Sequence, residues 1–308
     1  MSNMNDAVGL RIPYGTTSGQ FQTEFEPASG TLWGWMNPKG NPCFNLGLLR
    51  DIRAHDEALE ANGGLVEVEG EQHSVRYYVG ASRAPRAYNL GGDLALFMLL
   101  IKARDRVALA RYAEKCLDNL HARIRHYGSS TMTTIALVQG DALGGGFECA
   151  LSSDLIVAEE STQMGLPEIM FNLFPGMGAY QLLSRRVGVR GAEELMLSGR
   201  LLTATKLHEM GVVDVLAKDG QGESAVQNWI ATNKRRDNGT RGIFGLRQIV
   251  NPVRREELDA VVETWVDAAL RLNDRDLRMM GWLVRAQQAR MERGDGAEPV
   301  EQRLAAAG

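Results

Sequence analysis

Cysteine is scarce in this 308-residue chain, which holds only Cys43, Cys116 and Cys149. The three residues lie far apart, form no Cys-x-x-Cys pair and have no histidine at the spacing of a metal site. An odd number of separated cysteines makes a poor disulfide framework and argues against structural zinc. We therefore expect no metal site and a location in the reducing cytoplasm.

The chain also lacks long apolar runs and an excess of positive charge. It has no run of 18 uncharged apolar residues, and no basic stretch followed by an apolar one stands at its N-terminus. We therefore expect neither a membrane span nor a secretory signal. Lys and Arg number 34 against 38 Asp and Glu, which gives a net charge of −4. Because this balance creates no global positive field, we expect no nucleic-acid partner.

Proline is rare, with 9 residues, whereas glycine is abundant, with 34. This excess of glycine predicts close backbone turns. Hydrophobic residues make up 44% of the chain and charged residues 23%. These are ordinary globular proportions, and they exclude a wholly disordered or fibrous chain.

Three regions follow one another along the sequence. Residues 1–26 are polar and without periodicity, so we interpret them as an N-terminal arm that is disordered or laid over a neighbour. Residues 27–219 alternate between strand-like and helical runs and form the predicted core. Residues 220–308 carry no strand signal, and we interpret them as a C-terminal helical region.

Within the core, apolar and β-branched runs predict strands at 31–36, 65–69, 75–81, 133–139 and 154–159. Helices are predicted at 46–62, from 93 to about 125, at 144–153 and at 179–187. Strands that alternate with helices in this way indicate parallel βαβ-type units, so the predicted fold class is α/β. In the C-terminal region, one helix face is marked by apolar residues at three- and four-residue spacing: Leu258, Val261, Val262, Trp265, Val266, Ala269 and Leu272.

The most informative segment is Ala142-Leu143-Gly144-Gly145-Gly146-Phe147-Glu148, which follows a predicted strand and opens a predicted helix. A backbone N–H at a helix N-terminus has no acceptor within the helix, so Gly145 can donate to an anionic oxygen. Glu148 lies about one turn further on and would hold a carboxyl beside that oxygen. The alternative is a glycine-rich turn for tight packing, with Glu148 as a partner of the helix dipole. We assign the adjacent Cys149 to packing rather than to a nucleophilic role.

Glu168 provides a second carboxyl, in an apolar loop 20 positions after Glu148. A carboxyl among leucine, proline, isoleucine and methionine is desolvated, which raises its pKa and suits it to proton transfer near neutral pH. The alternative is a glutamate that caps the next helix.

Together these motifs resemble the crotonase superfamily, the enoyl-CoA hydratase and isomerase group of thioester enzymes. The resemblance covers about 30–215 and includes the turn 89–93, the ALGGG-x-E motif, the Pro-Glu motif at Glu168 and the Pro-Gly-x-Gly motif after it. It implies a ββα spiral core with a C-terminal α-helical region. It also implies that the amides of Gly92 and Gly145 form an oxyanion hole and that Glu148 and Glu168 are the catalytic residues.

Within the superfamily, the stretches 77–83, 89–94, 139–141 and 174–180 look most like synthases of diffusible signal factors, which are cis-2-unsaturated fatty acid quorum-sensing signals. This resemblance implies dehydration of a 3-hydroxyacyl thioester on acyl carrier protein, followed by hydrolysis to the free acid, without a cofactor. Two alternatives stay open: an enoyl-CoA hydratase or isomerase acting on coenzyme A thioesters, and a catalytically silent regulatory module.

The resemblance also implies partners and a substrate pocket. A homotrimer or a dimer of trimers is expected, and a regulatory signalling protein is a further possible partner. The C-terminal region would serve the acyl pocket and oligomerisation, with Met177, Trp265 and Leu283 lining the pocket. Trp265 could instead belong to the core or to a trimer interface, since it lies in the apolar stripe. Four basic residues could meet an acidic carrier protein or simply form a solvated helix face: Lys102, Arg104, Arg106 and Arg111.

Overall fold

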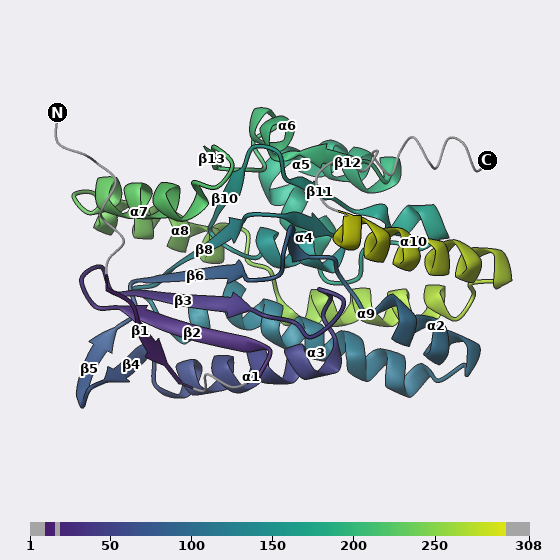
Figure 1. The fold of residues 1–308 in the computed structure, drawn as a ribbon, viewed down its shortest axis with the longest axis horizontal. Coiled ribbons are helices and arrows are strands. Elements are labelled where there is room, and N and C mark those ends of the chain that lie inside the picture. The colour runs from purple at the N-terminus through teal and green to yellow at the C-terminus, as the bar shows by residue number, and fades with distance from the viewer. Residues whose placement is uncertain (1–9, 16–18, 294–308) are drawn as a thin grey trace.

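The computed structural model describes residues 10–15 and 19–293, and side chains in the last helix as far as residue 286. Its largest sheet has seven strands in the order β1-β2-β3-β6-β8-β10-β13 (Figure 1). The strands β1 to β3 are antiparallel to one another, and the pairs from β3 to β13 are parallel. Their bounds are Ile12–Tyr14, Phe21–Glu26, Thr31–Met36, Tyr77–Ser82, Thr133–Val138, Leu155–Glu159 and Val215–Ala217.

A second sheet has four strands in the order β12-β11-β9-β7, and β4 and β5 form a separate hairpin. The four strands span Leu201–Thr203, Gln163–Gly165, Asp141–Leu143 and Ala87–Asn89, and the hairpin strands span Leu65–Val68 and Glu71–Ser74. Three times the chain passes from a strand of the large sheet to a strand of the small sheet and then into a helix. This repeat confirms the predicted α/β spiral of ββα turns.

The central strands β3, β8 and β10 are buried along their whole length. A parallel strand that is covered on both faces favours such a continuous apolar sequence. The predicted strands at 31–36, 133–139 and 154–159 are therefore confirmed, with ends that shift by one residue or less.

The helices cover the sheets and fill the C-terminal part of the described chain. In order, α1 to α10 span Leu46–Ala61, Leu94–Lys102, Arg106–Ile124, Gly145–Leu151, Ala179–Ser198, Ala204–Glu209, Gly222–Asn233, Asp237–Val250, Arg255–Ala269 and Asp274–Arg293. Two short 3₁₀ helices, η1 and η2, span His126–Gly128 and Pro167–Phe171. The helix α3 packs against α1, α2 and α9, while α10 packs against α2 and η2 (Figure 1).

The prediction of one helix from 93 to about 125 is wrong, because the chain breaks into α2 and α3. Arg104 adopts a left-handed conformation with φ +53°, which ends α2. The Asp105 side chain then accepts a hydrogen bond from the backbone N–H of Ala108 and begins α3 as its N-cap. An aspartate after a basic residue was a helix-start signal that the apolar run concealed.

The prediction of an arm over 1–26 differs from the structure at 12–14 and 21–26, which form strands at the edge of the large sheet. In β2 the side chains of Phe21, Thr23 and Phe25 are buried and alternate with half-buried ones. This alternation is the period of a strand with one face on the core. Residues 1–9 and 16–18 lie outside the described residues, as do 294–308 of the C-terminal region.

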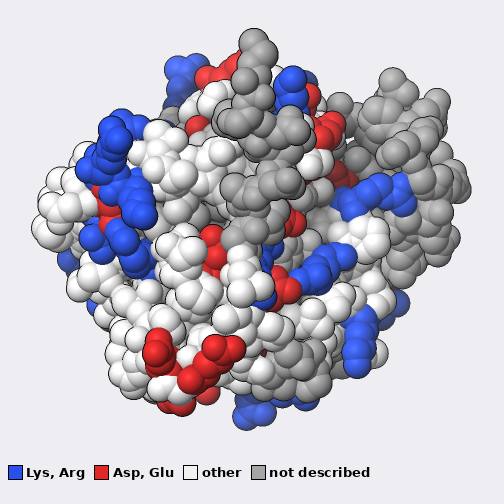
Figure 2. Space-filling model, turned by 60° about the vertical axis from the view of Figure 1, so that its left-hand side comes forward, with Lys and Arg blue, Asp and Glu red and all other residues white. Residues whose placement is uncertain are grey.

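The surface carries charges of both signs. On the face that Figure 2 shows, Lys and Arg side chains and Asp and Glu side chains lie interspersed among uncharged residues. No helix within the described ranges is both long enough and apolar enough to cross a membrane.

Candidate active site

Two glycine amides lie side by side at one edge of the small sheet. Gly92 follows β7, and Gly145 begins α4 directly after β9. A Cβ atom added to Gly91 would lie 3.1 Å from the Gly145 nitrogen, and one added to Gly145 would lie 3.6 Å from the Gly92 nitrogen. Among the described residues neither amide donates a hydrogen bond within the protein. Two adjacent free donors of this kind can bind one oxygen atom that carries negative charge.

Positive φ angles shape the turns that present these amides. Gly91 has φ +95° and Gly144 has φ +51°, conformations that favour glycine. The Asn89 side-chain oxygen accepts a hydrogen bond of 2.8 Å from the Gly91 N–H and fixes the first turn. A Cβ atom at Gly146 would collide with the Asn89 carbonyl oxygen, so only glycine fits there. Sequence reasoning missed both Asn89 and Gly146, although both lie inside the motifs that it singled out.

Glu148 points its carboxyl at the loop before α5. The side chain is 1% exposed, and its Oε1 accepts hydrogen bonds from the backbone N–H groups of Met177 at 2.8 Å and Ala179 at 2.9 Å. Burial raises the pKa of Glu148 to about 7, and the two hydrogen bonds act in the opposite direction by stabilising the carboxylate. Glu148 therefore lies in the first turn of α4 as a buried carboxyl and not as a solvated one.

Glu168 comes from η2, which follows β11. Its Oε1 lies so close to the backbone of α4 that a Cβ atom at Gly144 would collide with it, and its Oε2 is buried without a hydrogen-bond partner. Burial raises the pKa of Glu168 to about 8, and the nearby charge of Glu148 adds to the rise. Both carboxyls therefore have pKa values raised into the range near neutral pH, which suits groups that transfer protons.

Strand pairing explains why these groups meet. In the small sheet β9 pairs in parallel with β7 on one side and with β11 on the other. Residues that follow parallel strands emerge at the same edge of the sheet. Gly92, the Gly145–Glu148 turn of helix and Glu168 therefore converge although they are distant in sequence.

An apolar cavity adjoins the two amides and the two carboxyls. It is lined by all seven predicted site residues: Gly92, Gly145, Glu148, Glu168, Met177, Trp265 and Leu283. Trp265 packs edge-on against Phe97 with ring centroids 5.1 Å apart, and Phe97 packs edge-on against Tyr112 at 5.0 Å. Residues of the lining that sequence reasoning missed are Phe97, Tyr112, Cys116, Phe171 and Leu173.

Trp265 lies both in the hydrophobic core and in the wall of the cavity, two of the roles that the sequence left open for it. The side chain is 5% exposed and belongs to the main hydrophobic core, yet it also lines the cavity. A Cβ atom at Gly176 would lie 2.7 Å from its ring, so the loop before α5 passes directly against it. The wall of the cavity is thus part of the packed core.

All four basic residues are exposed, and one of them has carboxylate partners. Arg106 donates hydrogen bonds to the carboxylates of Glu263 and Asp267, which ties α3 to α9. Lys102, Arg104 and Arg111 are exposed.

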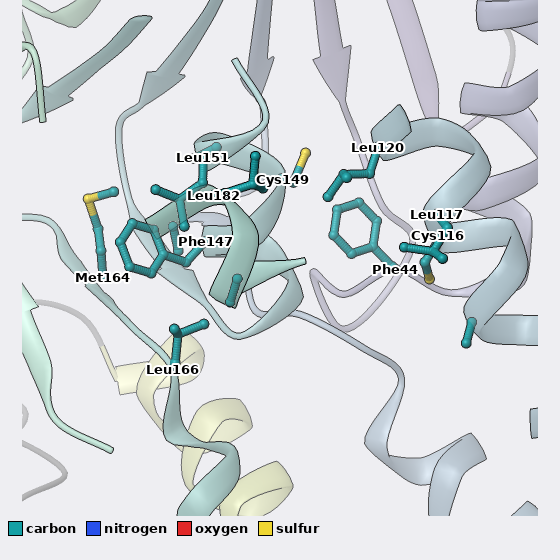
Figure 3. Close-up of a cluster of buried hydrophobic side chains, with 14 of the residues drawn as sticks. Phe44, Cys116, Leu117, Leu120, Phe147, Cys149, Leu151, Met164, Leu166 and Leu182 are labelled. Carbon is teal, nitrogen blue, oxygen red and sulfur yellow. The ribbon is translucent and has the colours of Figure 1, made fainter. Parts of the chain in front are cut away.

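The buried side of α4 carries apolar residues. Figure 3 shows Phe147 lying toward Met164 and Leu182, while Cys149 leaves the helix toward Leu120. Cys149 is 7% exposed and belongs to the main hydrophobic core, as expected of a residue that packs there. No group of three or more His, Cys, Asp or Glu side chains within the described part of the chain could hold a metal ion.

Comparisons with known proteins agree with this architecture. The model of the enoyl-CoA hydratase/isomerase family matches residues 64–237. The mitochondrial enoyl-CoA hydratase domain-containing protein 2 of Homo sapiens is 35% identical over 158 residues, which cover 51% of each chain. The present chain thus spans about half the length of that curated relative.

Solved structures share the fold over most of the chain. An enoyl-CoA hydratase/isomerase from Xanthobacter autotrophicus Py2 has a TM-score of 0.67 at 21% identity and covers 91% of this chain and 100% of its own. Pseudomonas aeruginosa DspI has a TM-score of 0.59 at 23% identity, with coverages of 86% and 98%. At these identities the likeness concerns the fold, whereas the family match rests on sequence. The chain belongs to the enoyl-CoA hydratase/isomerase family, in the crotonase superfamily.

Proposed function

We propose that this protein makes a cis-2-unsaturated fatty acid signal. It dehydrates a 3-hydroxyacyl thioester on acyl carrier protein and then hydrolyses the thioester to release the free acid. The observation that carries the proposal is the pairing of two buried carboxyls, with pKa values raised to about 7 and about 8, beside two free amides at the head of an apolar cavity.

The amides of Gly92 and Gly145 receive the thioester oxygen. Removing a proton from C2 places negative charge on this oxygen, and two fixed donors stabilise that charge as it develops. The loss of one such donor typically lowers the rate by about 10²–10³-fold. The amides need no reorganisation, because their turns are already held by Asn89 and by the start of α4.

Glu148 and Glu168 divide the proton transfers of dehydration. One ionised carboxylate takes the C2 proton, and the other, protonated carboxyl gives its proton to the departing 3-hydroxyl group, which leaves as water. A pair that holds one proton near neutral pH supplies both forms together.

The same groups serve the hydrolysis. A carboxylate takes a proton from water, the resulting hydroxide attacks the thioester carbon, and the tetrahedral oxyanion forms at the same two amides. The carbon–sulfur bond then breaks, and the thiol of the carrier leaves with the proton. One site can therefore run both reactions in sequence.

The apolar cavity suits a fatty acyl chain. Met177, Trp265 and Leu283 form part of its wall, and the last two come from α9 and α10 in the C-terminal region. Ligand sites in proteins are generally lined by apolar side chains, with a few polar groups that fix the orientation of the ligand. We assign the C-terminal region to the acyl pocket on this basis.

A homotrimer or a dimer of trimers is part of the proposal. One face of α8 exposes large apolar side chains, namely Ile243, Leu246, Ile249 and Val250. Exposed apolar patches of this kind mark surfaces that other protein covers.

Three buried, unpaired cysteines, one of them on the site helix α4, support a cytoplasmic location.

A second candidate function is the hydration or isomerisation of enoyl-CoA thioesters. The family match favours it, because the matched model carries that description. The oxyanion pair and the two carboxyls would serve hydration equally well, since it is the reverse of the dehydration step.

Product analysis separates the candidates. The purified protein is incubated with the same 3-hydroxyacyl chain on acyl carrier protein and on coenzyme A, and the acids and thioesters are identified by mass spectrometry. Free cis-2 acid from the carrier-protein substrate supports the synthase. Reversible interconversion of the CoA thioesters without free acid supports the hydratase, and no turnover of either substrate by the folded protein supports a silent module.

A further inference from the structure

The helix that carries the site, α4, is only seven residues long and presents both the Gly145 amide and Glu148. An isolated helix of this length is not stable, because nucleation costs more than its few hydrogen bonds return. Its position must therefore be fixed by contacts with the rest of the protein. These contacts decide where the oxyanion donor and the carboxyl lie.

The C-terminal end of α4 is fixed by a side chain from another helix. The Ser153 N–H donates to the carbonyl of Ala150, so the carbonyl of Cys149 receives no backbone donor there. That carbonyl accepts instead from the hydroxyl of Ser152 at 2.7 Å and from the Arg123 guanidinium at 3.3 Å. Arg123 also donates to the Cys149 sulfur at 2.8 Å.

Arg123 is an unusual residue for the interior. It belongs to α3, it is 5% exposed, and the described residues place no carboxylate at ion-pair distance from it. Its Nε donates to the Tyr127 hydroxyl at 3.4 Å. A buried cation is costly unless its hydrogen bonds are specific and well placed. Here the contacts run to Cys149, at the negative end of the α4 dipole, where a cation is stabilising.

We propose that Arg123 is a positioning residue that holds α4 through Cys149. It thereby keeps the Gly145 amide and the Glu148 carboxyl in place relative to the other residues of the site. This inference rests on the proposed thioester chemistry for its kinetic readout. The guanidinium does not touch the substrate; it acts through the residue next to Glu148. Loss of the contact lets α4 shift relative to Gly92, which leaves the oxyanion with one donor in place of two.

The test compares three variants of the full-length protein. Arg123→Met removes the charge and all donors, while Cys149→Ala removes only the sulfur acceptor on α4. Tyr127→Phe is the matched control, because it removes a hydrogen bond of the guanidinium that does not reach α4. Two measurements are made: kcat and KM with the thioester substrate that the wild type turns over, and amide hydrogen exchange of the ligand-free protein over 145–151.

We expect Arg123→Met to lower kcat at least about tenfold while KM changes by less than about threefold, because oxyanion stabilisation acts in the transition state. The amides of α4 should exchange at least about tenfold faster. Cys149→Ala should shift both readouts in the same direction by less, and Tyr127→Phe should keep both within about twofold of the wild type.

Other results would overturn the proposal. A folded Arg123→Met protein with wild-type kcat and exchange would show that α4 is held elsewhere, and equal losses in Tyr127→Phe would make Arg123 an ordinary core residue. If Arg123→Met does not fold, Cys149→Ala decides: wild-type kcat and exchange in that variant would refute the proposal. A wild type that turns over neither thioester would refute the proposed function, and the exchange data would still decide the role of Arg123.

Discussion

Replacing Glu168 by glutamine should make the folded protein more stable at alkaline pH while removing its activity. The side chain of Glu168 is buried in the cavity wall with one oxygen unpartnered, and burial together with Glu148 raises its pKa from 4.5 to about 8. Ionising this group in the folded protein is therefore costly. Glutamine keeps the shape of the side chain and cannot ionise.

The magnitude follows from the two pKa values. A carboxyl with a raised pKa in the folded state contributes stability at low pH, below its unfolded value, and that contribution is lost as the pH rises through the folded value. Between about pH 6 and about pH 8, Glu168 is ionised in the unfolded chain and protonated in the folded protein. Unfolding then releases up to one proton, and the free energy of unfolding falls by about 1.4 kcal/mol per pH unit well below the folded pKa and by less close to it, or about 2 kcal/mol over this range.

Denaturant unfolding followed by tryptophan fluorescence measures this difference. The free energy of unfolding of Glu168→Gln minus that of the wild type should increase by about 2 kcal/mol from about pH 6 to about pH 8. Above the folded pKa the difference should level off. A difference that stays constant over this range would show that Glu168 is not held protonated by its surroundings, and the acid–base assignment would fail.

Three further predictions concern the activity. The dehydration rate should follow a bell-shaped pH profile with its maximum near the pKa values of about 7 and about 8. The rate should fall at lower pH, where both carboxyls are protonated, and at higher pH, where both are ionised. A rate that climbs steadily beyond about pH 9 would contradict the shared proton. Gly145→Val should lower turnover by about 10²-fold or more in a folded protein, because even its Cβ atom would lie 2.8 Å from the Met177 sulfur. Turnover near the wild-type rate would show that this turn has only a structural role. Trp265→Ala or Leu283→Ala should change the selectivity for acyl chain length by about tenfold, measured by mass spectrometry as the ratio of released acids of different length. An unchanged product distribution at an unchanged rate would show that the acyl chain binds elsewhere.

The chemistry-bearing residues were accessible from the sequence because they lie in short local motifs. A glycine run between a strand and a helix specifies the turn at Gly144 and the start of α4, and both carboxyls follow such strands. The parallel pairing of β7, β9 and β11 then brings the motifs to one edge. Local sequence motifs and the order of the strands together were enough to predict which residues meet in this part of the site.

The remaining features depend on contacts between distant residues. Arg123 lies near other basic residues at the end of α3, and only the tertiary structure makes it a buried donor to Cys149, 26 positions away. Phe97 and Tyr112 appear as ordinary core residues until α2 and α3 are separated at Asp105. Periodicity identifies the buried face of a helix, but it does not identify what that face contacts.

The central claim is that one site dehydrates the acyl thioester and then hydrolyses it. The most direct measurement is a reaction of the purified protein with a 3-hydroxyacyl thioester on acyl carrier protein in ¹⁸O-labelled water, with the products analysed by mass spectrometry. The account predicts free cis-2-unsaturated acid that carries one ¹⁸O atom in its carboxyl group, and no such acid from Glu148→Gln or Glu168→Gln. Free acid formed at the wild-type rate by either folded variant, or an unsaturated product that stays bound to the carrier, would contradict it.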